Sequence, residues 1–322
     1  MIVVTGGAGF IGSCMVAHLN AMGRTDIIIV DDMLPEDAKK RNISARKYAA
    51  YYDKEAFLQL ALQDKVPGDI SHVIHMGACS STTGTDRAYY MKNNFEYSCH
   101  MARWAFGKKA RFIYASSAAT YGDGERGYSD SVESIRHCKP LNLYGESKQL
   151  FDEWILENNF YDKVVGLKFF NVFGPNEYHK GDMKSVIAKA YGNVAGEGKM
   201  VLFKSHRPDY ADGEQKRDFI YVNDVLSVMQ FFCDHPEANG IYNVGTGEAR
   251  SWNDLARALF AAVGKAPEIR YVDMPEHLRA RYQYFTQADM SRLRAAGYTK
   301  PFMPLERAIK DYAEFLKNNS CL

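Results

Sequence analysis

The residues that most restrict the fold of this chain lie at its start. The apolar run Ile2–Thr5 leads into Gly6-Gly7-Ala8-Gly9-Phe10-Ile11-Gly12, and a helical stretch and a second apolar run ending in an acid follow. A buried strand, a Gly-x-x-Gly-x-x-Gly turn, a helix and a second strand with a terminal acid open a dinucleotide-binding α/β fold. We expect Gly6 to permit the tight turn, Gly9 to let backbone approach a pyrophosphate, and Gly12 to let the helix pack closely on the strand. The helix N-terminus would bind the phosphates.

The alternation of strands and helices continues beyond this unit. Apolar runs at 71–76, 111–115 and 164–170 are each preceded by helical patterns, which predicts a Rossmann-type α/β fold, a doubly wound parallel sheet. After Pro175 the chain becomes irregular and charged, with a helix expected near 183–194 and a strand near 201–203. We expect a smaller α/β substrate lobe there. The predicted division is a dinucleotide-binding domain of residues 1–172 and 214–248, and a substrate-binding lobe of residues 173–213 and 249–322. The segment 217–225 is expected to return to the sheet lobe.

Composition excludes several classes of protein. The 322 residues carry a net charge of +1, with 40 basic and 39 acidic side chains interspersed, which argues against a dedicated binder of nucleic acid or of membrane surfaces. No run of eighteen apolar residues is present, and Met1 leads straight into a strand without a signal-peptide pattern. The six cysteines are scattered without Cys-x-x-Cys spacing, so we expect reduced thiols, no metal site and a cytoplasmic protein.

Tyr144 and Lys148 form the candidate catalytic pair. Four residues apart, they would lie on one face of a helix. Tyrosine titrates near about 10, so its pKa must fall by about three units, or roughly 4 kcal/mol, for the phenolate to act near neutrality. The Lys148 ammonium and an oxidised nicotinamide would supply positive charge that lowers this pKa. The pair is then suited to removing an alcohol proton.

Small and hydroxylated residues follow two of the predicted strands. Gly77–Thr83 follows the third strand and Ser116–Gly122 the fourth, at the edge of the sheet where ligands bind. Asp31, at the end of the second strand, suits the adenosine ribose hydroxyls of NAD. The loop after it holds Lys39, Lys40, Arg41, Arg46 and Lys47, which suit a 2′-phosphate, so the residues alone leave NAD and NADP open.

Together these motifs resemble the extended short-chain dehydrogenase/reductase superfamily, the NAD-dependent epimerases and dehydratases, over nearly the whole chain. The matching residues are the glycine pattern, Ser117, Tyr144 with Lys148, Asn171–Pro175 and Arg217–Val222. Within the superfamily, Gly77–Thr83, Tyr114–Gly122, His179-Lys180-Gly181, Arg281-Tyr282-Gln283 and Thr286–Asp289 are similar to the branch that inverts carbon 6 of an ADP-activated heptose.

This resemblance implies a mechanism and a pathway. Tightly bound NADP takes hydride from carbon 6 of ADP-D-glycero-D-manno-heptose, a 6-keto intermediate forms, and hydride returns to its other face. The L-glycero product serves the inner core of bacterial lipopolysaccharide. Tyr144 would serve one face and Lys180 the other. Lys148 would bind the nicotinamide ribose and acidify Tyr144, and Ser117 would hydrogen-bond the reacting oxygen.

The resemblance also assigns binding residues, and it favours NADP over NAD. The implied cofactor residues are Gly6, Gly9, Phe10, Ile11, Gly12, Asp31, Asp32, Lys39, Lys54, Met76, Gly77, Ala78, Cys79, Ser80, Asn93, Lys148, Val172 and Lys180. The implied substrate residues are Ser81, Ser117, Asn171, Asp182, Lys189, Phe203, Lys204, Ser205, His206, Arg217 and Tyr282. A homo-oligomer, a pentamer, is implied as well.

The chain departs from that branch in the substrate lobe. Asp182 stands where Ser is common, Lys189 where His is common, and Phe203-Lys204-Ser205-His206 replaces Phe-Glu-Gly-Ser. An alternative is therefore another nucleotide-sugar epimerase, such as a UDP-hexose 4-epimerase, which would not need Lys180. A 4,6-dehydratase would carry an Asp-Glu pair where this chain has Ala118-Ala119. A redox-sensing or scaffolding protein on this fold would typically have lost Tyr144 or Lys148.

Overall fold

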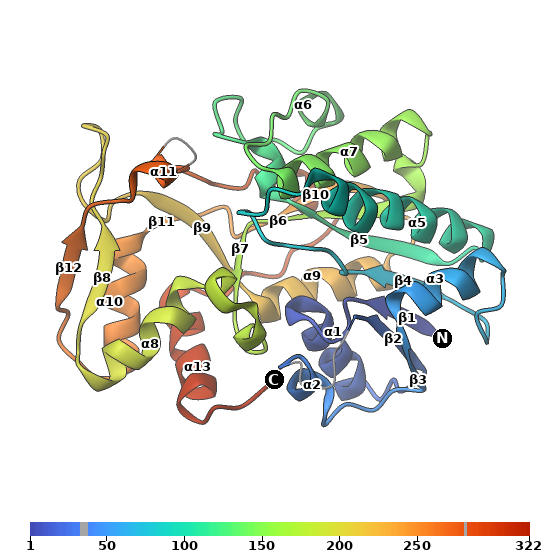
Figure 1. Cartoon of the computed structure of the whole chain (residues 1–322), viewed down its shortest axis with the longest axis horizontal. Coiled ribbons are helices and arrows are strands. Elements are labelled where there is room, and N and C mark those ends of the chain that lie inside the picture. Colours follow the sequence, from blue (N-terminus) through green and yellow to red (C-terminus); the bar gives the residue numbers. More distant parts are fainter. Residues whose placement is uncertain (33–37, 280–281) are drawn as a thin grey trace.

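A seven-stranded parallel sheet forms the centre of the larger lobe (Figure 1). The computed structural model describes residues 1–32, 38–279 and 282–322. The strand order is β10-β6-β5-β4-β1-β2-β3, and every neighbouring pair is parallel. The strands are β1 Ile2–Thr5, β2 Ile27–Asp31, β3 Ala50–Asp53, β4 His72–His75, β5 Arg111–Ser117, β6 Val164–Phe169 and β10 Gly240–Val244. Connections lead in opposite directions on the two sides of β1, so a crevice is expected between β1 and β4. The predicted fold class is confirmed.

Helices cover both faces of this sheet (Figure 1). One layer contains α1 (Phe10–Ala21) and α9 (Val222–Asp234), and the other contains α3 (Lys54–Leu62), α5 (Tyr97–Gly107) and α7 (Leu143–Glu157). Alternate strand residues enter separate cores: Val4 packs with residues of α1 and α9, and Val3 packs with residues of α3, α5 and α7. Burial on both faces explains why these strands are continuous apolar runs in the sequence.

The smaller lobe is built on two small sheets. The strands β7 (Asn171–Phe173), β9 (Lys216–Tyr221) and β11 (Ala249–Ser251) form one sheet, and β8 (Met200–Phe203) pairs with β12 (Ile269–Val272). Helices α8 (Val186–Gly196), α10 (Trp252–Ala262) and α13 (Leu305–Lys317) pack together beside them (Figure 1). Short helical segments complete the chain: α2 Lys40–Ile43, α4 Arg87–Tyr90, α6 Val132–Ile135, α11 Glu276–Arg279, α12 Ser291–Ala295, a π-helix Met91–Glu96, and 3₁₀ turns Ala118–Tyr121, Tyr161–Lys163 and Tyr178–Met183.

Two expectations about this region are corrected. The predicted return of 217–225 to the sheet lobe is right for α9 but wrong for β9, which pairs with β7 and β11 and not with the large sheet. The helix expected from about residue 183 begins at Val186, because the Ser185 side chain accepts a hydrogen bond from the Ala188 N–H and caps it. Gly181, at φ +52°, interrupts the preceding turn. No helix in residues 1–32, 38–279 and 282–322 is long and apolar enough to cross a membrane.

Candidate active site

A cleft of about 530 Å³ opens at the C-terminal ends of the central strands. It is lined by the glycine turn, the end of β2, the loop after β4, the end of β5, the start of α7 and the segment 178–183. The structure places all four candidate catalytic residues and every predicted cofactor residue on its wall, together with Ser81. These residues are Gly6, Gly9, Phe10, Ile11, Gly12, Asp31, Asp32, Lys39, Lys54, Met76, Gly77, Ala78, Cys79, Ser80, Asn93, Ser117, Tyr144, Lys148, Val172 and Lys180.

Sequence reasoning missed other residues of the wall. They are Thr5, Val30, Tyr89, Tyr97, Ala115, Phe169, Phe170, His179 and Met183. The rule that ligands bind at the C-terminal ends of parallel strands would have found those at the ends of β1, β5 and β6. Tyr89 and Tyr97 belong to α4 and α5, and no pattern in the sequence indicates that they line the cleft.

The glycine turn allows backbone to approach backbone in the cleft floor. Gly6 has φ +64°, and a Cβ there would lie 2.6 Å from the Gly77 nitrogen after β4. A Cβ on Gly12 would lie 2.1 Å from the Gly6 carbonyl oxygen. Helix α1 therefore starts directly against the turn, and its first three residues, Phe10, Ile11 and Gly12, line the cleft, where a phosphate would fit the N-terminal end of the helix.

Two acids and two lysines neutralise each other at the end of β2. The buried Asp31 carboxylate accepts hydrogen bonds from the Ala8 N–H and from Lys39 Nζ, both at 2.9 Å. Asp32 accepts from Lys39 and from Lys54, each at 3.0 Å. Burial opposes ionisation of Asp32, but these lysines prevail and lower its pKa to about 2. Lys54 also donates to the Asn93 amide oxygen at 2.9 Å, which joins the cluster to the π-helix.

Tyr144, Ser117 and Lys148 come together where β5 ends against α7. Asn142 caps α7 by accepting from the Gly145 N–H, which fixes the start of the helix at Leu143. Lys148 Nζ donates to the Ala115 carbonyl at 2.8 Å and lies 6.0 Å from the centre of the Tyr144 ring. Burial lowers the pKa of Lys148 to about 8, against the attraction of Asp152.

The pKa of Tyr144 has the direction opposite to the one expected from the sequence. Burial raises it, and hydrogen bonding with Ser117 opposes the rise. The reason is that the phenol is desolvated, while the Lys148 ammonium lies towards the ring and is bound to a carbonyl. In this structure Lys148 alone does not produce the phenolate.

Lys180 reaches the same cleft from another part of the chain. It follows β7, in the turn Tyr178–Met183, and its Nζ lies 5.5 Å from the centre of the Phe10 ring. Burial lowers the pKa of Lys180, and Glu177 opposes the shift. A partly desolvated lysine is therefore available in the cleft in addition to Tyr144.

Asn94, which sequence reasoning missed, ties the cleft together from the π-helix. Its buried amide accepts from the Cys79 N–H at 2.8 Å, donates to the Cys79 carbonyl at 3.0 Å and donates to Ser147 Oγ at 2.9 Å. Ser147 Oγ in turn donates to the Tyr144 carbonyl at 2.7 Å. The loop after β4 and the helix that carries Tyr144 are thus held at a set distance.

Most of the predicted substrate residues lie away from this cleft, in the smaller lobe. Arg217 is buried, with its guanidinium 5.7 Å from the Trp252 ring centre and 5.1 Å from that of Tyr282. Burial lowers its pKa, and within the part of the chain that the structure describes its guanidinium donates to the carbonyls of Lys216 and Gln283. A guanidinium held by neutral groups is free to accept an anionic ligand.

The other predicted substrate residues are spread over the lobe. Lys204 forms an ion pair with Asp273 at 3.3 Å, and the backbone N–H groups of Ser205 and His206 bind Asp212 and the Tyr284 hydroxyl. Phe203 ends β8. Lys189 Nζ donates to the Asp182 carbonyl at 3.1 Å, and both residues are exposed, as is Asn171 at the start of β7. Arg281, part of the motif that carried the resemblance, lies outside the described residues.

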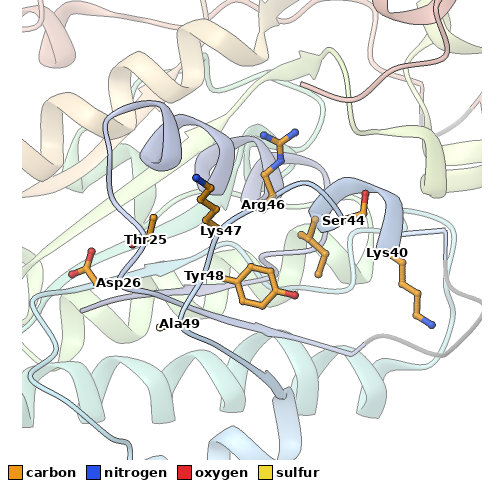
Figure 2. A pocket seen from close by; sticks show the side chains of 9 residues that line it. Thr25, Asp26, Lys40, Ser44, Arg46, Lys47, Tyr48 and Ala49 are labelled. Atoms are coloured by element: carbon orange, nitrogen blue, oxygen red, sulfur yellow. The ribbon is translucent and has the colours of Figure 1, made fainter.

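A larger hollow lies elsewhere on the surface. It measures about 810 Å³ and is lined by basic and polar side chains that include Lys40, Arg46, Lys47 and Tyr48 (Figure 2). None of the candidate catalytic residues lines it. All four candidate catalytic residues line the cleft at the strand ends instead.

Comparisons with known proteins agree with this geometry. The protein named ADP-L-glycero-D-manno-heptose-6-epimerase from Nitratidesulfovibrio vulgaris is 51% identical over 312 residues, which cover 97% of this chain and 96% of its own length. The protein of the same name from Fusobacterium nucleatum is 46% identical over 323 residues, with coverages of 98% and 97%.

Solved structures show the same fold. The crystal structure of Helicobacter pylori ADP-L-glycero-D-manno-heptose-6-epimerase superposes with a TM-score of 0.82 at 29% identity, over 98% of this chain and 96% of that one. UDP-N-acetylglucosamine 4-epimerase from Methanobrevibacter ruminantium superposes with a TM-score of 0.83 at 23% identity, over 99% and 98%. The sequence pattern of the NAD dependent epimerase/dehydratase family matches residues 2–245. The chain belongs to the NAD dependent epimerase/dehydratase family.

Proposed function

We propose that this protein epimerises carbon 6 of ADP-D-glycero-D-manno-heptose, giving the L-glycero product for lipopolysaccharide inner-core synthesis. The observation that carries the proposal is that two proton-transferring side chains of different origin, Tyr144 and Lys180, line one cleft. A centre whose hydrogen leaves one face and returns to the other needs a proton donor or acceptor on each side. The names of the two relatives at 46% and 51% identity support the same substrate.

The cleft suits a nicotinamide dinucleotide, and its acid–lysine cluster favours NADP. The glycine turn and the start of α1 would hold the pyrophosphate. Asp31 alone would repel a 2′-phosphate, but its carboxylate already accepts a hydrogen bond from Lys39. Lys54 donates to the neighbouring Asp32. Both ammonium groups would then donate to that phosphate. When bound, the nicotinamide would supply a reversible hydride acceptor.

Four side chains of the cleft would each have a separate role in the reaction. Ser117 and Tyr144 would hydrogen-bond the 6-hydroxyl oxygen, and Tyr144 would take its proton. Lys148 would bind the nicotinamide ribose, and its charge would favour the phenolate once the cofactor adds positive charge beside Tyr144. Lys180 would transfer the proton on the opposite face. Tyr144 and Lys180 are half-buried in the cleft, and a bound substrate would exclude further water and protect a ketone at carbon 6 from side reactions.

The smaller lobe would hold the nucleotide. We propose that residues 171–221 and 249–322, which include β7 and β9, form the substrate-binding part, and 1–170 and 222–248 the dinucleotide-binding part. Arg217 lies between Trp252 and Tyr282 and has no carboxylate partner within residues 1–32, 38–279 and 282–322, so it would bind the diphosphate. The expected pentamer and the cytoplasmic location stay predictions.

The deciding experiment is incubation of the purified protein with ADP-D-glycero-D-manno-heptose in heavy water, followed by NMR. We expect the L-glycero epimer without deuterium at carbon 6. Deuterium at that carbon would refute internal hydride return, and turnover of UDP-hexoses alone would move the protein to a 4-epimerase.

Single variants test the two proton-transferring residues. Tyr144→Phe and Lys180→Met should each lower the rate of epimer formation at least about 100-fold, the usual contribution of a general acid or base. Lys310→Met, a change at an exposed lysine of α13, is the control and should leave the rate unchanged. Full activity of Lys180→Met would show that a single residue serves both faces.

A further inference from the structure

A fully buried ion pair lies behind the cleft wall. Lys168 Nζ on β6 is 2.7 Å from the Asp152 Oδ2 on α7, and both side chains have 0% exposure. The same carboxylate accepts hydrogen bonds from the Tyr114 hydroxyl at 2.8 Å and from Ser116 Oγ at 2.7 Å. Neither charged residue lines the cleft. Burying two charges costs free energy and is weak evidence of a stabilising role, so another role is worth seeking.

The Asp152–Lys168 ion pair is connected to Ser117 through two sets of hydrogen bonds. Ser116, the residue before it, is bound by Asp152. Lys168 Nζ donates to Thr120 Oγ1 at 2.8 Å, and Thr120 Oγ1 donates to the Ser117 carbonyl at 2.8 Å. A change in the pair would therefore shift the end of β5, where the Ser117 hydroxyl meets Tyr144.

The carboxylate also acts on Lys148. Tyr144, Lys148 and Asp152 follow one another at four-residue spacing along α7, so they share one face of the helix. The attraction of Asp152 opposes the burial that lowers the pKa of Lys148. Titratable groups on the elements around Lys148 include Tyr144 and Asp152 on α7, His75 on β4, Cys79 after β4, Tyr114 on β5, Lys168 on β6 and Lys180 after β7. Helix α7 also carries Glu146, which is bound by Arg87, and Glu153, which is bound by Gln149. Asp152 is the carboxylate whose charge opposes the lowered pKa of Lys148.

We propose that Asp152, held by Lys168, is a positioning residue that keeps Lys148 charged while fixing Ser117 beside Tyr144. The inference rests on the proposed function for its catalytic consequence, but not for its effect on Lys148. At the spacing of one helical turn and an effective dielectric constant of about 20, loss of the carboxylate lowers the pKa of Lys148 by about one to two units. Lys148 would then be largely neutral at pH 8 and would no longer favour the phenolate.

The test compares three proteins. In Asp152→Asn/Lys168→Met both charges are removed, so no charge is left unpaired in the core and folding is expected. In Thr120→Val the ion pair stays and only the bridge to Ser117 is cut. Asp152→Asn alone is added if it folds.

The first measurement is the reactivity of Lys148 towards acetic anhydride between pH 5.5 and 10, followed by mass spectrometry, which needs no turnover. The midpoint should fall by about one to two pH units in Asp152→Asn. It should fall by less in the double variant, because loss of the Lys168 ammonium offsets part of the loss of the carboxylate, and it should stay in place in Thr120→Val. A midpoint that stays in place in both Asp152 variants, or that falls equally in Thr120→Val, would overturn the proposal.

The second measurement is the pH profile of kcat for the ADP-heptose. The alkaline limb should move down with the Lys148 midpoint, which costs roughly tenfold in kcat at pH 8, while KM changes little. An alkaline limb that stays in place although the Lys148 midpoint falls would refute the catalytic part. If the wild-type protein does not turn over this sugar, the proposed function fails while the acetylation result still decides the role of Asp152.

Discussion

Replacing Gly12 by Ala would separate helix α1 from the glycine turn. The new Cβ would lie 2.1 Å from the Gly6 carbonyl oxygen, 2.7 Å from its carbon and 3.0 Å from the Gly7 Cα. All three are backbone atoms of the turn, so no side-chain rotation relieves the contact. An ordinary contact is about 3.5 Å, so the helix must move by about 1 Å if the turn relaxes to take up the rest of the difference. Overpacking of this kind costs about 1–3 kcal/mol.

The expected effects can be scaled from the length of the chain. At about 2.1 cal/mol/K per residue, the 322 residues give an unfolding entropy near 0.7 kcal/mol/K, so a loss of about 3 kcal/mol lowers Tm by about 4 °C. Affinity for the cofactor should fall more sharply, by about 100-fold, because the N–H groups that would bind the pyrophosphate move with the helix.

The matched control is Gly192→Ala on the exposed side of α8, where a Cβ meets nothing within 4 Å. It should raise stability by about 0.5–1 kcal/mol, since alanine favours the helix. Differential scanning fluorimetry gives Tm, and titration calorimetry with NADP gives the affinity. A Gly12→Ala protein with Tm and NADP affinity equal to those of the wild type would refute the close approach of α1 to the turn.

Three further perturbations test other parts of the structure. Burial lowers the pKa of His75 from about 6.5 to about 3, so the unfolded chain binds a proton at a higher pH than the folded one. The free energy of unfolding therefore falls as the pH drops from 6.5 towards 3, by about 2 kcal/mol at pH 5. Urea unfolding of His75→Asn should show a smaller loss of stability than the wild type between about pH 7.5 and 5, and an equal loss would contradict this assignment. Arg217→Met should raise KM for the ADP-sugar about 10-fold or more and leave the affinity for the cofactor unchanged. Arg217→Lys should restore KM only poorly, because the planar guanidinium is lost. If the affinity for NADP changes instead, Arg217 belongs to the cofactor site and not to the substrate site. Lys39→Met should weaken NADP binding by about 10–100-fold, the value of a charge-assisted hydrogen bond, and leave NAD nearly unaffected; equal losses for both cofactors would remove the argument for NADP.

Much of the redox half of the molecule could be predicted from local patterns. A buried parallel strand must be apolar on both faces, so β1, β2, β4, β5 and β6 are visible as continuous apolar runs. The positive φ of Gly6 and the spacing of Tyr144 and Lys148 are equally local properties of a turn and of a helix. Local patterns therefore identified five of the seven strands of the large sheet, and together with the family resemblance they identified the cofactor residues of the cleft wall.

Only the tertiary structure decided how distant groups affect one another. The pairing of β9 with β7 rather than with the large sheet joins residues 48 positions apart in the chain, such as Asn171 and Phe219, and such pairing has no signature in periodicity. The hydrogen bonds of Asn94 to Cys79 and Ser147, and the burial of Asp152 with Lys168, join four separate elements. The pKa of Tyr144 shows the reason most directly. Its direction depends on desolvation by the packed chain as well as on nearby charge, and the four-residue spacing to Lys148 reports only the second of these.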